Sequence, residues 1–151
     1  MEVLMRQAGR IAGLIVIGLA VGCATRVSVM ETHREDVSAQ SRVLAIAARN
    51  LEETVLRQRA DASQEEAARA VAKFHNEAEE FARAASRWIS NDNVNTRYER
   101  LIDAWVKVKK TYSNLKPDSL VQDAYRRTAD EWERLARASG YANKAYERKM
   151  E

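Results

Sequence analysis

The chain has 151 residues, of which 46% are hydrophobic and 31% charged, with five glycines, one proline and one cysteine. This length suits one domain, and the scarcity of glycine and proline disfavours an all-β fold with many turns. The single cysteine excludes an internal disulfide and any site built on several cysteines, and a net charge of only +3 does not indicate a nucleic-acid partner.

The first 23 residues have the parts of an export signal. Arg6 and Arg10 precede an uncharged apolar run from Ile11 to Gly22, which ends directly at Cys23. A basic start, a short apolar stretch and small residues at its end are typical of a secretory signal peptide. The run is shorter than the roughly 20 residues needed to cross a bilayer, so we expect it to be removed.

The stretch Leu19-Ala20-Val21-Gly22-Cys23 resembles the lipobox of bacterial lipoprotein precursors. In that family the signal is cut before the cysteine, which then carries the lipid chains. The resemblance therefore implies cleavage after Gly22 and lipidation of Cys23, with palmitate among the attached chains. Ala20 departs from the leucine that is commonest at its position. A plain secretory signal and an N-terminal membrane anchor are the alternative interpretations.

The resemblance also implies a location. Ala24, rather than aspartate, follows the cysteine, and in the family this implies the periplasmic face of the outer membrane of a Gram-negative-type bacterium. The predicted organisation is a signal peptide over 1–22, a lipidated cysteine and tether over 23–35, and a helical domain over 36–151. Met1 and Met5 are both possible starts.

The first two predicted helices have apolar residues at alternating steps of four and three, which places them on one helix face. The first helix is expected from about residue 36 to 58, and Val43, Ile46 and Ala47 are expected to widen its apolar stripe. The second is expected over 64–89, with Ser63 and Glu66 as a capping box. The two seams are Val37, Ser41, Leu44, Ala48, Leu51 and Val55, and Ala67, Val71, Phe74, Ala78, Phe81, Ala85 and Trp88.

The third and fourth predicted helices continue the same spacing. Asn93 or Asn95 is expected to cap the third helix, and Pro117 to end it. The fourth is expected to start at Asp118 or Ser119, with Ser119 and Gln122 as a capping box, and Gly140 is a candidate break before a short terminal helix. The two seams are Val94, Tyr98, Leu101, Trp105, Val108, Tyr112 and Leu115, and Val121, Tyr125, Thr128, Trp132, Leu135, Ser139, Ala142 and Tyr146.

Four amphipathic helices joined by short polar loops predict an all-α fold, an antiparallel four-helix bundle. The stripes are wider than the seam of a long dimeric coiled coil, which favours a globular bundle. All ten aromatic residues lie in the last three helices, so the first helix is expected to be the most lightly packed. Ion pairs at i, i+4 are expected to mark solvated faces: Glu53–Arg57, Glu65–Arg69, Glu79–Arg83 and Asp130–Arg134.

No pattern indicates catalysis, a metal or a cofactor. The haem-attachment sequence C-x-x-C-H is absent, and neither His33 nor His75 completes the Glu-x-x-His element of a di-iron site. In a hairpin centred near residue 61, His75 would face residue 47 and lie far from His33. We expect His75 to pair with Glu79 on a helix flank.

One surface feature is a candidate for partner binding, the lysine cluster of Lys107, Lys109, Lys110 and Lys116, with Arg126 and Arg127 expected close by. Its alternative interpretation is a solvated helix end, where cations suit the helix dipole.

Taken together, the patterns predict a non-enzymatic binding, scaffold or accessory role within an envelope assembly, with an envelope protein or the cell wall as partner and no nucleic acid. The alternative is a bundle that carries haem, a metal or a hydrophobic molecule. The sequence leaves the partner, the pathway and the oligomeric state open.

Overall fold

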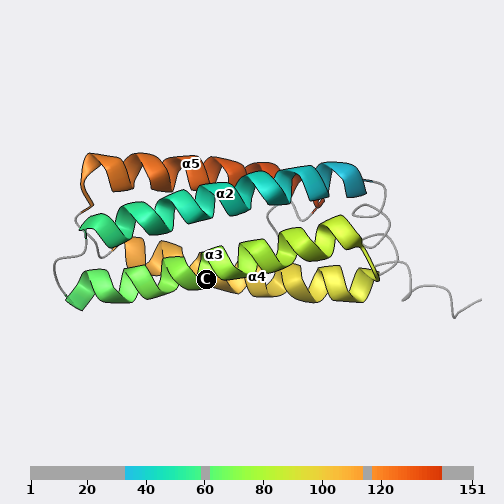
Figure 1. The fold of residues 1–151 in the computed structure, drawn as a ribbon, viewed down its shortest axis with the longest axis horizontal. Coiled ribbons are helices and arrows are strands. Elements are labelled where there is room, and N and C mark those ends of the chain that lie inside the picture. Colours follow the sequence, from blue (N-terminus) through green and yellow to red (C-terminus); the bar gives the residue numbers. More distant parts are fainter. Residues whose placement is uncertain (1–32, 59–61, 114–116, 141–151) are drawn as a thin grey trace, which may run out of the picture.

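The computed structural model describes residues 33–58, 62–113 and 117–140, and within them the chain forms four helices and no strand. The helices are α2 (Arg34–Gln58), α3 (Ala62–Arg87), α4 (Asn91–Tyr112) and α5 (Ser119–Ala138) (Figure 1). The predicted all-α four-helix bundle is confirmed. The predicted signal peptide and Cys23 lie outside the described residues.

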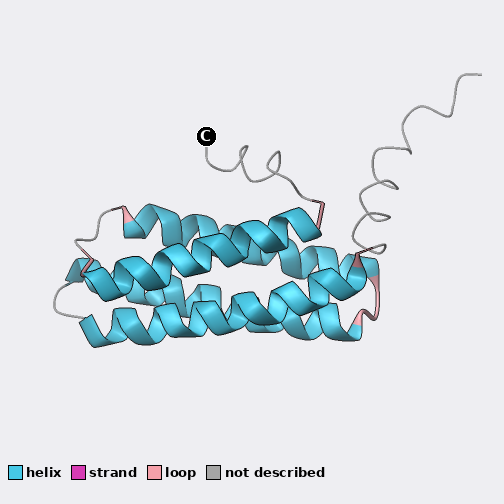
Figure 2. Ribbon diagram, turned by 90° about the horizontal axis from the view of Figure 1, so that it is seen from above, coloured by secondary structure: helices cyan, strands magenta, loops and turns pink. Residues whose placement is uncertain are grey.

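The four helices run along a common direction (Figure 2), and the colours of Figure 1 show that consecutive helices are antiparallel. The backbone of α2 packs closely against α3 and α5, and α3 also packs closely against α4. Helices α4 and α5 meet mainly through large aromatic side chains, including a stack of Trp105 on Trp132 with ring centroids 5.8 Å apart. The aromatic rings therefore fill the fourth side of the bundle.

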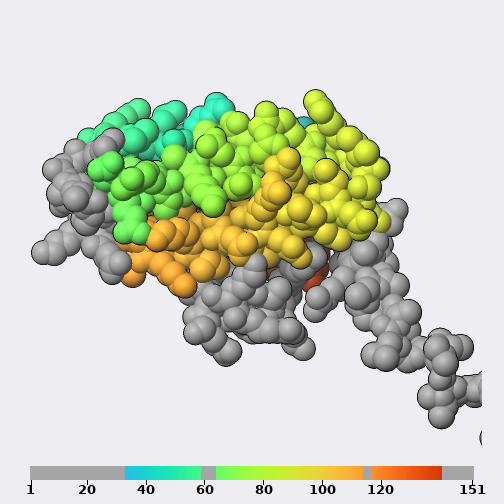
Figure 3. Space-filling model, turned by 90° about the horizontal axis from the view of Figure 1, so that it is seen from below, coloured from blue at the N-terminus to red at the C-terminus, as the bar shows by residue number. Residues whose placement is uncertain are grey.

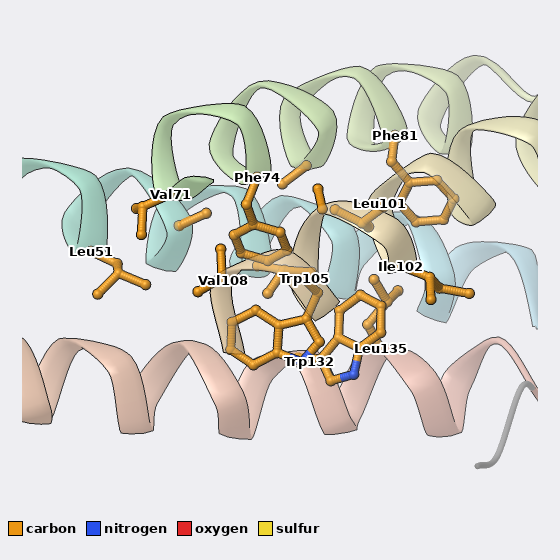
Figure 4. Close-up of a cluster of buried hydrophobic side chains, with 14 of the residues drawn as sticks. Leu51, Val71, Phe74, Phe81, Leu101, Ile102, Trp105, Val108, Trp132 and Leu135 are labelled. Carbon is orange, nitrogen blue, oxygen red and sulfur yellow. The ribbon is translucent and has the colours of Figure 1, made fainter. Parts of the chain in front are cut away.

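The core follows the predicted seams. Every seam residue of the first two predicted helices is buried, and those of the last two are buried except the half-buried Tyr112 and Tyr125 and the residues outside the described part. Phe74, Trp105 and Trp132 meet at the centre, between α3, α4 and α5 (Figure 4). The alternating spacing places these side chains on one face because an α-helix turns 100° per residue.

The predicted widening of the first stripe is wrong for two residues. Val43 is 44% exposed and Ile46 is 63% exposed, whereas Ala47 is half-buried. At 100° per residue, Ile46 lies about 200° around the helix from the buried Leu44, so a helix whose seam faces the core must turn Ile46 outward. Val43 and Ile46 are therefore left on the surface, as is Leu56 farther along α2.

The predicted caps of α4 are also wrong. Ser90, in an extended conformation, caps the helix, and its hydroxyl accepts a hydrogen bond from the Asn93 backbone N–H at 3.2 Å. Helix α4 consequently begins at Asn91, so Asn93 and Asn95 lie within its first turns. The cap precedes them because the chain leaves its extended conformation at Ser90.

Helix α5 starts within the predicted range, but not through the predicted capping box. The Asp118 side chain accepts from the Val121 backbone N–H at 2.8 Å, while the Gln122 side chain donates to the Pro117 carbonyl at 2.9 Å. Gly140, with φ of 67°, follows the end of α5, as expected for a left-handed residue after a helix. The predicted break is therefore confirmed, and the short terminal helix expected after it lies outside the described residues.

Helix α3 begins at Ala62, before the predicted start. Glu66 was expected to reach back toward Ser63, but its Oε1 accepts from Lys107 Nζ at 2.5 Å instead. Glu66 therefore pairs with a lysine on a neighbouring helix and does not form the capping box that the sequence predicts.

Candidate functional site

The predicted lysine cluster is only partly assembled. Lys107 on α4 pairs with Glu66 on α3, and this hydrogen bond and charge lower the pKa of Glu66 below its ordinary value. Lys109 and Lys110 also take part in polar interactions, and Lys116 lies outside the described residues. Figure 3 shows the face on which α3 (green) and α4 (yellow to orange) pack side by side.

The two arginines expected near the lysines point to different places. Arg126 is close enough to Tyr112 on α4 for its charge to oppose the rise that burial causes in the pKa of that phenol. Arg127 instead lines a groove between α2 and α5. Adjacent helical residues point 100° apart, so the two guanidinium groups lie on different faces of α5.

A polar cluster joins α2 to α3 around His75, whose side chain is 13% exposed. The two ring nitrogens lie at hydrogen-bond distance from two carboxylates, with Nδ1 2.6 Å from Glu52 Oε2 and Nε2 3.1 Å from Glu79 Oε1. Arg49 on α2 also donates to Glu79, at 2.6 Å. The predicted pairing of His75 with Glu79 is confirmed, and both ring nitrogens can donate only when the imidazole is protonated.

The predicted neighbour of His75 on α2 is wrong, because His75 meets Glu52 and not residue 47. The Cα–Cβ bonds of a helix tilt toward its N-terminus. Side chains of α2 therefore lean away from the connection to α3, and side chains of α3 lean toward it. The lean shifts the partner of His75 along α2 by about one turn.

Glu79 is the electrostatic centre of this cluster. The hydrogen bond from Arg49 is the largest cause that lowers the pKa of Glu79, followed by the hydrogen bond from His75. Arg83, expected to pair with Glu79, pairs with Glu80 instead. The cluster links two helices and holds its carboxylate ionised.

Of the other three predicted surface pairs, two are confirmed and one is wrong. Arg57 lies 3.8 Å from Glu53 and Arg69 lies 3.9 Å from Glu65, as predicted. Arg134 pairs with Glu131, which also accepts from Gln40 on α2, and not with Asp130. Arg134 thus pairs with Glu131, whose carboxylate faces α2, and not with the residue four positions before it in the sequence.

A groove of about 600 Å³ runs along the surface between α2 and α5. Its apolar lining comes from both helices: Val43, Ile46, Ala47, Leu120 and Ala124. Leu120 is 68% exposed, which is unusual for a large apolar side chain, and Ile46 is similarly exposed. Asn50, Glu53, Asp123 and Arg127 are among its polar lining residues.

Sequence reasoning missed this groove. The exposed angle of Val43 and Ile46 on α2 was available from the helical period, but Leu120 belongs to a helix far away in the sequence. Only the packing of α5 against α2 brings the two sets together.

A cavity of about 10 Å³ lies among Leu51, Val71, Tyr112 and Tyr125, which is about the smallest space that holds one water. The indole Nε1 of Trp105 and Oε2 of Glu77 are buried without a hydrogen-bond partner among the described residues. Most buried polar groups have partners, so the Trp105 N–H is an exception inside an apolar stack.

The described helices contain neither a cluster of metal ligands nor a membrane span. His, Cys, Asp and Glu residues there form no group of three or more that could hold a metal ion. None of these helices combines the length and apolar character that crossing a bilayer requires.

Comparison with known proteins brings no relative to this chain. No family model matches it, and neither a curated protein nor a solved structure resembles it significantly.

Proposed function

We propose that this protein is an outer-membrane lipoprotein, anchored through Cys23, whose periplasmic helical bundle binds or supports another component of the cell envelope. The observation that carries the proposal is the place of the single cysteine, directly after a short apolar run that ends in Gly22. Two or more acyl chains on Cys23 would anchor the protein stably, at about 0.8 kcal/mol per buried methylene.

The geometry of the bundle supports a tethered arrangement. Arg34, at the start of α2, donates to the Arg87 carbonyl at 3.3 Å and lies over the Trp88 ring. The start of α2, the α3–α4 turn and the end of α5 are thus at one end of the bundle, on the right in Figure 1. The tether would join this end, so the opposite end would project into the periplasm.

A binding role is supported by where the apolar surface lies. Among the described residues five large apolar side chains are exposed, and three of them, Val43, Ile46 and Leu120, line the α2–α5 groove. Exposed apolar residues gathered in a groove mark an interaction surface more often than a random surface does. The lysines of α4 are a second, more polar place where an envelope protein or the cell wall could bind.

The anchor is tested with Cys23→Ala in cells that carry the full chain. The substitution should abolish incorporation of radiolabelled palmitate and release the protein from the membrane fraction. The matched variant Ala24→Ser keeps the cysteine and should be labelled like the wild type. Continued labelling of Cys23→Ala would show that the lipid is attached elsewhere and would reject the proposal.

The binding role is tested by chemical cross-linking in the native host, followed by isolation of the protein and mass spectrometry. An envelope component recovered in stoichiometric amount supports the proposal. An ultraviolet–visible spectrum of the same material examines the alternative of a cofactor-carrying bundle, and a stoichiometric Soret band would overturn the non-cofactor interpretation.

A further inference from the structure

Ile89 has the most exposed large apolar side chain in the part of the chain that the structure describes, with 81% of its surface accessible. It is the middle residue of the three-residue connection between α3 and α4. Such turns favour glycine, asparagine and serine, which suit a change of chain direction. An isoleucine with this exposure adds little to the turn or to the core, so its apolar surface is free to contact a partner.

The residues on either side hold Ile89 in its exposed position. The Trp88 ring is buried in the core, and its Nε1 donates to Asn91 Oδ1 at 2.8 Å. On the other side, the Ser90 hydroxyl caps α4 and accepts from the Asn93 backbone N–H at 3.2 Å. The chain is therefore fixed directly before and directly after Ile89.

The α3–α4 connection also lies beside the start of α2 (Figure 1). Arg34, the first residue of α2, donates to the Arg87 carbonyl at 3.3 Å and lies 5.6 Å from the centroid of the Trp88 ring. The eleven residues from Cys23 to His33 span at most about 36 Å even when fully extended. A chain anchored at Cys23 would therefore keep this connection close to the membrane.

We propose that Ile89 contacts the membrane, where it inserts among the lipid headgroups of the bilayer that holds the acyl chains of Cys23. This inference rests on the proposed anchoring of the protein. One isoleucine side chain removes too little apolar surface from water to hold a free protein on a bilayer. An anchored protein needs only a weak contact, because the tether makes the contact intramolecular and raises its effective concentration.

The charges around Ile89 favour a zwitterionic lipid surface over an anionic one. Exposed residues of both signs lie in the first turn of α2 and beside the connection: Arg34, Glu35, Asp36, Arg87 and Asp92. Because the signs are mixed, this end of the bundle has no strong attraction to anionic headgroups. The contact should therefore form with a zwitterionic phospholipid and persist in high salt, which weakens only electrostatic attraction.

Leu120 offers a matched control, since it is 68% exposed and also lies at an end of the bundle. It follows Asp118, whose backbone N–H donates to Gln58 Oε1 at 3.3 Å, at the end of α2. Leu120 is thus at the opposite end from Ile89. A membrane contact made by the tethered end alone should involve Ile89 and not Leu120.

The test measures how closely residue 89 approaches the bilayer. The full chain with Ile89→Cys is purified from membranes, labelled on the new thiol with a polarity-sensitive fluorophore, and reconstituted in phosphatidylcholine vesicles. A nitroxide-labelled lipid, with the nitroxide just below the headgroups, should quench this fluorophore severalfold more than the same fluorophore at Leu120→Cys. The wild-type chain, whose Cys23 carries lipid in the anchored protein, gives the background of labelling.

Flotation with the vesicles reports the anchor separately from the contact. Weak quenching at residue 89, equal quenching at both positions, or quenching that disappears in high salt, in protein that floats with the vesicles, would overturn the contact and leave the anchor intact. A chain that does not float with the vesicles would reject the anchor, and the contact with it.

Photo-cross-linking in intact cells separates a lipid neighbour from a protein neighbour. A photoreactive residue in place of Ile89 in the full chain should attach to phospholipid and give no discrete larger band on a gel. A cross-link to a protein of defined mass would assign Ile89 to a protein partner and overturn the proposal. Far-UV circular dichroism checks that each variant keeps its helices, which substitution of so exposed a side chain should not alter.

Discussion

Trp88 is held in a left-handed backbone conformation, with φ of 42°, at the end of α3. A non-glycine residue there costs about 1–2 kcal/mol because Cβ crowds the following carbonyl. Three contacts offset the cost. The ring is buried, its Nε1 donates to Asn91 Oδ1 at 2.8 Å, and the Arg34 guanidinium lies 5.6 Å from the ring centroid.

Two substitutions of Trp88 separate the contribution of the buried ring from the cost of the left-handed backbone. Trp88→Ala should destabilise the bundle by about 3 kcal/mol, because the buried ring is lost while the strain remains. Trp88→Gly should be about 1 kcal/mol less destabilising, since glycine adopts positive φ without strain. Urea unfolding followed by circular dichroism gives both values, and a glycine variant less stable than the alanine variant would refute the strain.

At the scale of helices, the Arg49–Glu79–His75 cluster clamps α2 to α3 with groups that titrate. Arg49 and His75 lower the pKa of Glu79 below its ordinary value of 4.5. A carboxyl whose pKa is lower in the folded state stabilises that state above the ordinary pKa. This contribution is lost as the pH falls from about 4.5 through the lower folded value.

Glu79→Gln should therefore reduce the free energy of unfolding near pH 7, and the difference from the wild type should shrink as the pH falls below about 4.5. Unfolding in urea at pH 7, 5, 4 and 3 measures it. Arg49→Met removes the largest cause of the shift and should show the same trend. A difference that stays constant down to pH 3 would contradict the assignment of the clamp to the ionised carboxylate.

At the scale of the whole molecule, α2 is fully integrated although it contributes no aromatic side chain. It was expected to be the most lightly packed helix, yet Val37, Leu44, Ala48 and Leu51 are fully buried between α3 and α5. Thr128 also bridges α5 to the Ala47 carbonyl. The four helices thus share one core and should unfold together.

Leu44→Ala tests whether the four helices unfold together. The substitution should cost about 2–5 kcal/mol as it leaves a cavity in the core. Circular dichroism reports all four helices, whereas fluorescence reports Trp88, Trp105 and Trp132, which lie outside α2. The two thermal transitions should shift together. A loss of helicity that precedes the fluorescence change would show that α2 detaches by itself.

The sequence was sufficient to predict what depends on a single helix. The steps of four and three found the buried faces, because burial within a bundle follows the helical period. It misplaced the α4 cap at Ser90, the neighbour of His75 and the exposure of Ile46, since each depends on a turn conformation, a side-chain lean or an adjoining helix. Ile46 and Leu120 line the same groove, and the spacing of apolar residues within one helix cannot predict that two helices bring them together.

The shared end of α2 and α5 has a mechanical consequence for a tethered bundle. A pull between Arg34 and Ser139 would act across the two helices at one end and peel them apart turn by turn, so that few contacts resist at any moment. A pull between Arg34 and the far end near Gln58 and Asp118 would load the helices lengthwise, and all their contacts would resist together. A partner bound at the far end would therefore pull against high mechanical resistance. A partner bound at the near end would separate α2 from α5 at a lower force.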